Sequence, residues 1–180
     1  MIKSAFLKEN TKKLILSFYE NTEDVNLINK NELIKIKFEI DINPPSNATY
    51  ETKFKLLPSS YQVKLYDLSS LFARKIHACL CRNKKTRIKG RDFYDYVFFL
   101  SLGAKVNLQH WKSRLVESEA FKEEDELTID KLKILLNNRF KTIDFEQAKM
   151  DVYPFIKDKS KLDCWNVDFF IQITENIEAK

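Results

Sequence analysis

Two acidic side chains on one predicted strand are the first candidates for chemistry. Glu39 and Asp41 are two residues apart within the alternating segment 33–42, so they project from one face of a strand, about 7 Å apart. Carboxylates presented together in this way can hold Mg²⁺, a hard cation that takes oxygen ligands. The alternative is an ordinary solvated face, on which Lys35 and Lys37 balance the two acids.

Two cations fall within the apolar stripe of a predicted helix that runs from Asp67 to about Cys81. The stripe consists of Leu68, Leu71, Phe72, Ile76 and Cys79. Lys75 and Arg82 lie inside it at helical spacing. An ammonium group among apolar side chains is costly unless it has a partner or a ligand. We therefore expect Lys75 either to meet an acid or a phosphate, or to extend to solvent at the helix edge.

The next predicted helix, residues 93–102, begins with two acids. Asp92 and Asp95 are three residues apart and share a face. We expect Asp92 to cap the helix and Asp95 to lie in its first turn, where the helix dipole favours negative charge. The functional alternative is a carboxylate held against Lys75 or against a reacting group. Gly103 is expected to end this helix.

A basic segment joins these two helices. Its cations are Arg82, Lys84, Lys85, Arg87, Lys89 and Arg91. Beside the aromatic residues Phe93 and Tyr94, they are suited to contact the phosphates of a nucleic acid. The alternative is a solvated loop between two helices.

The remaining segments predict the scaffold that positions these residues. The 180 residues, 44% of them hydrophobic, suit a single domain of α+β class. We expect a small α/β lobe with a sheet over 1–57, followed by a helical lobe over 58–180. The predicted strands are 33–42, 50–57 and 63–66, and the other predicted helices are 4–20, 108–117, 129–140, 144–153 and 163–178.

Composition excludes several classes of protein. Only two glycines are present, so neither a P-loop nor a Rossmann glycine turn can be formed from this sequence. Three cysteines predict a reduced, cytoplasmic chain rather than a disulfide framework. No apolar run approaches the roughly 18 residues of a membrane span, so no membrane association is expected.

Taken together, the motifs resemble those of the AbiEii-type abortive-infection nucleotidyltransferase toxins. The segment Leu71–Arg74, then Lys75-Ile76-His77-Ala78 with Arg82, then Arg91-Asp92-x-x-Asp95, is similar to the third motif of that family. The strand Ile36–Asp41 is similar to the second motif, and the order and separation of the two motifs agree.

The resemblance implies a polymerase-β-like fold, an NTP with Mg²⁺, an RNA acceptor that is tRNA in characterised relatives, and a winged-helix antitoxin. It also implies that the first lobe, residues 1–57, is a partial, nucleotidyltransferase-like mixed sheet. It makes Glu39 the third sheet carboxylate, with Asp41 as the runner-up, and both are the candidate metal ligands. Lys75, helped by Arg82, would contact the NTP phosphates. Asp95 would be the acid of the catalytic pocket, oriented by Arg91 and Asp92.

The family's first motif, a Gly-Gly or Gly-Ser turn followed by Asp-x-Asp, has no counterpart before Glu39. Those aspartates hold the metal ions in this chemistry. We therefore expect the C-terminal two-thirds of such an enzyme, either a truncated gene product or one piece of a split enzyme, which is catalytic only if a separate N-terminal fragment completes it. The open edge of the strand predicts a dimer or a partner strand. The alternatives are a non-catalytic remnant that binds RNA or the antitoxin through residues 82–91, and an unrelated helical interaction protein.

Overall fold

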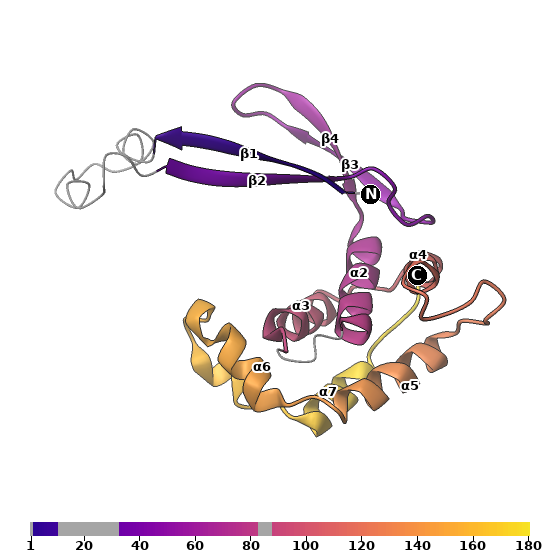
Figure 1. Cartoon of the computed structure of the whole chain (residues 1–180). Coiled ribbons are helices and arrows are strands. Elements are labelled where there is room, and N and C mark those ends of the chain that lie inside the picture. The colour runs from indigo at the N-terminus through magenta and orange to yellow at the C-terminus, as the bar shows by residue number, and fades with distance from the viewer. Residues whose placement is uncertain (1, 11–32, 83–87) are drawn as a thin grey trace. The chain divides into compact units, whose positions relative to one another are not determined.

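The computed structural model of the chain describes residues 2–10, 33–82 and 88–180, with side chains from Asp41 onward (Figure 1). The described chain divides into two compact units, Met1–Pro44 and Pro45–Lys180. Each unit is described below by itself.

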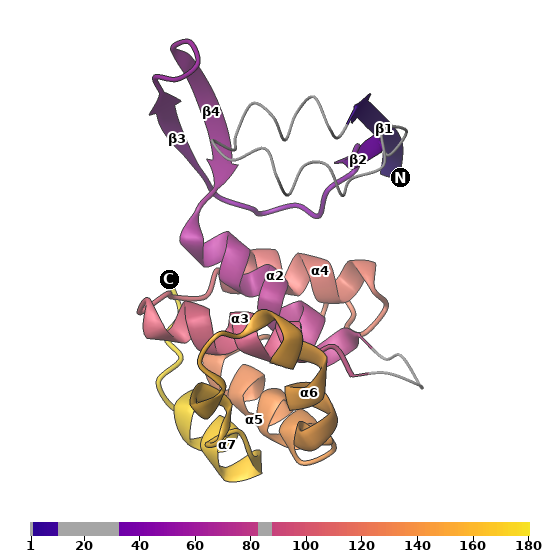
Figure 2. The ribbon, with the colours of Figure 1, turned by 90° about the vertical axis from the view of Figure 1, so that its left-hand side faces the viewer.

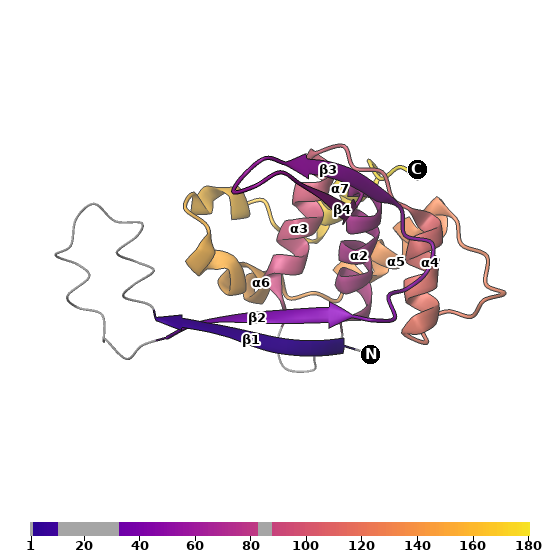
Figure 3. The same ribbon diagram turned by 90° about the horizontal axis from the view of Figure 1, so that it is seen from above.

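The first unit contains a two-stranded antiparallel sheet. Strand β1 (Ile2–Asn10) pairs with β2 (Leu33–Asp41), and Ile2 lies opposite Asp41 (Figure 3). This confirms the strand predicted over 33–42 and shows that β1 occupies one of its edges. The helix predicted over 4–20 is wrong for residues 4–10, which are extended, because pairing with a distant strand overrides a local helical pattern. Residues 11–20 lie outside the described part.

The second unit begins with a β-hairpin. Strands β3 (Tyr50–Lys55) and β4 (Tyr61–Tyr66) pair antiparallel, with Tyr50 opposite Tyr66 and their ring centroids 4.9 Å apart. Both strands were predicted, each to within a few residues at its ends. Contacts group this hairpin with the helices that follow it.

Helices make up the rest of the second unit (Figure 2). The described α-helices are α2 (Leu68–Cys81), α3 (Gly90–Ser101), α4 (Leu108–Glu117), α5 (Ile129–Phe140), α6 (Phe145–Val152) and α7 (Val167–Thr174). Two 3₁₀ turns, η2 (Tyr153–Phe155) and η3 (Lys159–Leu162), lie between α6 and α7. The α+β class is therefore confirmed, and the final helix is shorter than the predicted 163–178. No described helix has the length and apolarity needed to cross a membrane.

The core of this unit is built from aromatic side chains. Helix α2 packs against α3 and α4, α3 against α6, and α5 against α7. Phe72, Tyr96, Phe140 and Phe170 are fully buried at these contacts. The Tyr96 hydroxyl lies 2.7 Å from Thr174 Oγ1, which satisfies both buried polar groups.

The start of α3 differs from the prediction. The helix begins at Gly90, and its N-cap, Lys89, makes no side-chain capping bond, so Asp92 is not the N-cap. Gly90 is buried against α6, and a Cβ at this position would lie 1.9 Å from Ala148 O. Its N–H donates to Asp151 Oδ2 at 3.1 Å. The helix therefore starts where only glycine fits beside the α6 backbone.

We expect Gly90→Ala to lower the free energy of unfolding by about 1–3 kcal/mol, because the added methyl group forces α3 away from α6. Denaturant unfolding measures this. The matched control is Gly103→Asn: Gly103 has φ +63° with open space around it, and asparagine tolerates that conformation. Equal stability of Gly90→Ala and the wild type would contradict the close approach.

Candidate functional site

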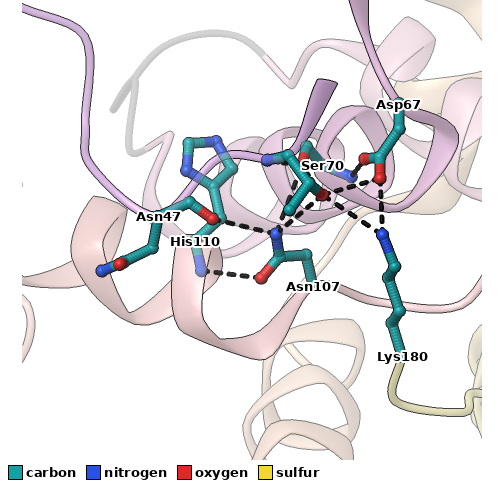
Figure 4. Close-up of polar contacts among 7 residues, drawn as sticks. Asn47, Asp67, Ser70, Asn107, His110 and Lys180 are labelled. Carbon is teal, nitrogen blue, oxygen red and sulfur yellow. Dashed lines mark hydrogen bonds and ion pairs between the residues drawn. The ribbon is translucent and has the colours of Figure 1, made fainter. Parts of the chain in front are cut away.

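A polar network fixes the first turn of α2 (Figure 4). Asp67 is the N-cap, and its Oδ1 accepts a hydrogen bond from Ser70 N–H at 2.8 Å. The N–H of Thr49 donates to Ser70 Oγ at 2.9 Å, and that of Asp67 donates to Thr49 O at 3.1 Å. The helix is thereby tied to the segment that precedes β3.

Helix α4 completes the network from the other side. Asn107, its N-cap, donates from Nδ2 to Asn47 O at 3.0 Å and to Ser70 Oγ at 3.3 Å. His110 Nδ1 lies 2.8 Å from Ser46 O. Ser70, Asn107 and His110 are all buried, so these bonds replace lost hydration and hold α2 and α4 in a defined geometry.

Lys180 closes the network through an ion pair with Asp67, Nζ to Oδ2 at 2.7 Å. Burial opposes ionisation of Asp67, but hydrogen bonds from Lys180, Thr49 and Ser70 outweigh it. They hold the pKa of this carboxyl well below its usual range. The first turn of α2 is therefore built around a stabilised negative charge.

One face of α2 lines an open pocket of about 650 Å³. Leu71, Arg74, Lys75, Ala78 and Arg82 contribute to it at helical spacing. Across the pocket, α3 contributes Arg91 and Asp92, and α4 contributes Arg114. Among the described residues, its lining holds four arginines and one lysine against a single carboxylate, so the pocket favours an anionic ligand.

Two ion pairs connect the cations of α2 to the acids of α3. Lys75 Nζ lies 2.5 Å from Asp95 Oδ2, and both side chains are about one-third exposed, at 38% and 30%. Arg82 Nη1 donates to both oxygens of Asp92, at 2.8 and 2.7 Å. The Asp92 side chain is only 6% exposed. The predicted acidic partner of Lys75 is thus confirmed.

A histidine and a serine also line the pocket. His77 Nε2 lies 3.0 Å from Ser118 Oγ. Burial and the nearby positive charge of Arg114 lower the pKa of His77 to about 4. The imidazole is therefore neutral at pH 7, and the positive charge of the described lining comes from lysine and arginine.

A comparison with protein families assigns the chain to one of them. The model of one family, the nucleotidyl transferase AbiEii toxins of type IV toxin–antitoxin systems, matches residues 3–172. The chain belongs to this family. Searches of curated proteins and of solved structures found no match.

Most of the candidate residues of this AbiEii chain gather at the pocket. Lys75, Arg82, Arg91 and Asp92 line it, and Asp95 contacts it through Lys75. Their catalytic and binding roles remain predictions. The segment 83–87, which carries three of the predicted basic residues, lies outside the described part.

The sequence did not predict that Arg74 and Arg114 line the pocket. Arg74 falls outside the apolar stripe of α2, and its guanidinium lies 5.1 Å from the ring centroid of Tyr66. Arg114 belongs to α4, which follows the motif at a distance. The seven-residue spacing of Lys75 and Arg82 does not reach Arg74, which lies about 100° from Lys75 around the helix. No local signal shows that α4 packs on α2.

The two strand carboxylates belong to the other unit of this AbiEii protein. Glu39 lies in β2 with its backbone opposite Ser4, and its side chain lies outside the described part. Asp41 is exposed at the end of β2, where its Oδ1 accepts a hydrogen bond from Asn43 N–H at 3.1 Å. Their role as metal ligands remains a prediction.

Nucleotidyl transfer generally employs a divalent cation, which needs several donor side chains close together. Among the side chains that the structure describes, no three histidine, cysteine or acidic residues converge as ligands. The acids at the pocket, Asp92 and Asp95, are committed to Arg82 and Lys75. The described side chains therefore do not form a metal site by themselves, and the side chain of Glu39 is not among them.

The Asp67 pair predicts a pH-dependent contribution to stability. Because the pKa of Asp67 is lower in the folded than in the unfolded chain, its charge stabilises the fold above about pH 4. That contribution disappears as the pH falls further, through the folded-state pKa. We expect Asp67→Asn to lower unfolding free energy by a constant amount between pH 5 and 8 and by less below about pH 4.

Denaturant unfolding across this pH range checks the expectation, and the exposed Asp163→Asn is the matched control. A difference between Asp67→Asn and the wild type that does not shrink in acid would show that the charge of Asp67 is not stabilised.

Proposed function

We propose that this AbiEii chain binds an NTP with its phosphates in the pocket between α2 and α3, and transfers the nucleotide to an RNA acceptor, tRNA being the class that the family resemblance implies. The observation that carries the proposal is the arrangement of Lys75, Arg82 and Arg91 around one open pocket. Arginine and lysine at close range are the groups that bind phosphates most strongly.

Each cation has an assigned role in this proposal. Lys75 turns from Asp95 toward the phosphates, whereas Arg82 stays paired with the buried Asp92 through Nη1 and offers its remaining N–H groups to the phosphates. Asp95 is the acid of the catalytic pocket, and Arg91 with Asp92 orients it. Glu39 and Asp41, on the lobe of residues 1–57, are the proposed ligands of Mg²⁺.

Completion of the site is part of the proposal, because the sequence supplies no glycine turn or Asp-x-Asp before Glu39. We propose that a separate N-terminal fragment provides these groups, and that the open edge of the sheet pairs with this fragment or with a second copy of the chain. A winged-helix antitoxin is the proposed protein partner, and the cytoplasm is the proposed compartment. Residues 58–180 form the proposed helical lobe.

We expect Lys75→Ala to weaken NTP binding by about tenfold or more, because a charge-assisted hydrogen bond to a phosphate is lost. Isothermal titration of the full chain with each of the four NTPs and Mg²⁺ measures this. Lys105→Ala is the matched control, since Lys105 pairs with Glu178 on the surface and does not line the pocket. Equal affinities for Lys75→Ala and Lys105→Ala would exclude a phosphate contact at Lys75.

A second candidate function is non-catalytic binding of RNA or of the antitoxin through residues 82–91. It is favoured by Arg91, which is exposed and forms no ion pair among the residues the structure describes. For RNA, this candidate predicts affinity that falls steeply with salt and persists in Lys75→Ala, without NTP binding. Fluorescence anisotropy with RNA at several salt concentrations checks it, and RNA affinity that is independent of salt would contradict it.

A further inference from the structure

A second pocket, of about 520 Å³, lies on the other side of the first turn of α3. Helix α6 runs beside α3 there, and the chain continues from α6 into η2 (Figure 2). The wall of the pocket consists of Tyr94 from α3 together with Val152, Phe155 and Ile156. Its volume is within the range of small-ligand sites, and its wall is largely apolar.

Two aromatic rings at this pocket are exposed without an apparent structural need. Phe155 is 83% exposed and Tyr94 is 39% exposed, although both belong to the well-packed helical unit. Exposed aromatic rings at a pocket offer flat faces on which a nucleobase can stack, and such stacking contributes about 1–3 kcal/mol per base.

The charged residues of the pocket favour a ligand with a phosphate. Among the described lining residues, Lys89 and Arg91 are the cations and Asp151 is the acid. One oxygen of that carboxylate accepts a hydrogen bond from the Gly90 N–H, which binds the acid to the helix start. A purely apolar peptide would make no use of the exposed Arg91, whereas a nucleotide uses the rings and this cation together.

Arg91 also lines the pocket that we assign to the NTP. The two pockets are therefore neighbours, separated by the first turn of α3. The end of a nucleic-acid strand held in one pocket would therefore lie next to a nucleotide held in the other.

We propose that this second pocket binds an unpaired nucleotide of a single-stranded nucleic acid, with the base against Tyr94 and Phe155 and its phosphate at Arg91. The proposal deepens the function proposed above, and rests on it for the identification of that strand as the acceptor. The binding site itself depends only on the groups that line the pocket.

Fluorescence anisotropy of the full chain with a 5′-labelled oligoadenylate RNA of six nucleotides tests the proposal. We expect Phe155→Ala and Tyr94→Ala each to weaken binding about tenfold, and Tyr94→Phe to retain it because a ring remains. Phe98→Ala is the matched control: Phe98 is 50% exposed on the same helix and does not line the pocket. Thermal unfolding establishes that each variant is folded.

Titration with NTP separates this proposal from the proposed function. We expect Phe155→Ala to bind NTP as the wild type does. RNA binding that depends on Phe155, in a chain that binds no NTP, would support the second pocket and remove the transferase function. RNA binding unaffected by both Phe155→Ala and Tyr94→Ala would overturn the second pocket and leave any Lys75-dependent NTP binding intact.

Discussion

The ion pair between Arg82 and Asp92 is the interaction on which the described site depends. A carboxylate as inaccessible as Asp92 is costly without a cation beside it, and Arg82 donates to each of its two oxygens. Removing one partner from a fully buried pair costs about 3–5 kcal/mol, and less here because Arg82 is over one-third exposed. The pair fixes α3 against the end of α2, and Lys75 then meets Asp95 one turn later.

The packing of the first turn of α3 determines where both pockets form. Helix α3 starts at Gly90 because the backbone of α6 leaves no room for a side chain, and Cys79 Sγ donates to the Asp92 carbonyl at 3.3 Å. The first turn of α3 is therefore held on two sides, by α2 and by α6. The polar network around Asp67 holds the opposite end of α2, so the cationic face of that helix is positioned at both ends.

The sequence predicted those elements whose signals are local. The helix of Lys75 and the strand of Glu39 each follow from spacing within a dozen residues, and the structure has them. The start of α3 was predicted incorrectly because the cause, Ala148 O beside Gly90, comes from a distant helix. Strand β1 was predicted as a helix for the same reason, since its partner is β2.

Arg91 has a consequence for the order in which ligands bind. Its side chain lines both pockets, so a ligand that draws the guanidinium into one pocket removes it from the other. Two occupants would then influence each other's affinity, and linkage requires the effect to be equal in both directions. A single arginine thus couples the two pockets thermodynamically, so that the ligand bound first changes the affinity of the other pocket for its own ligand.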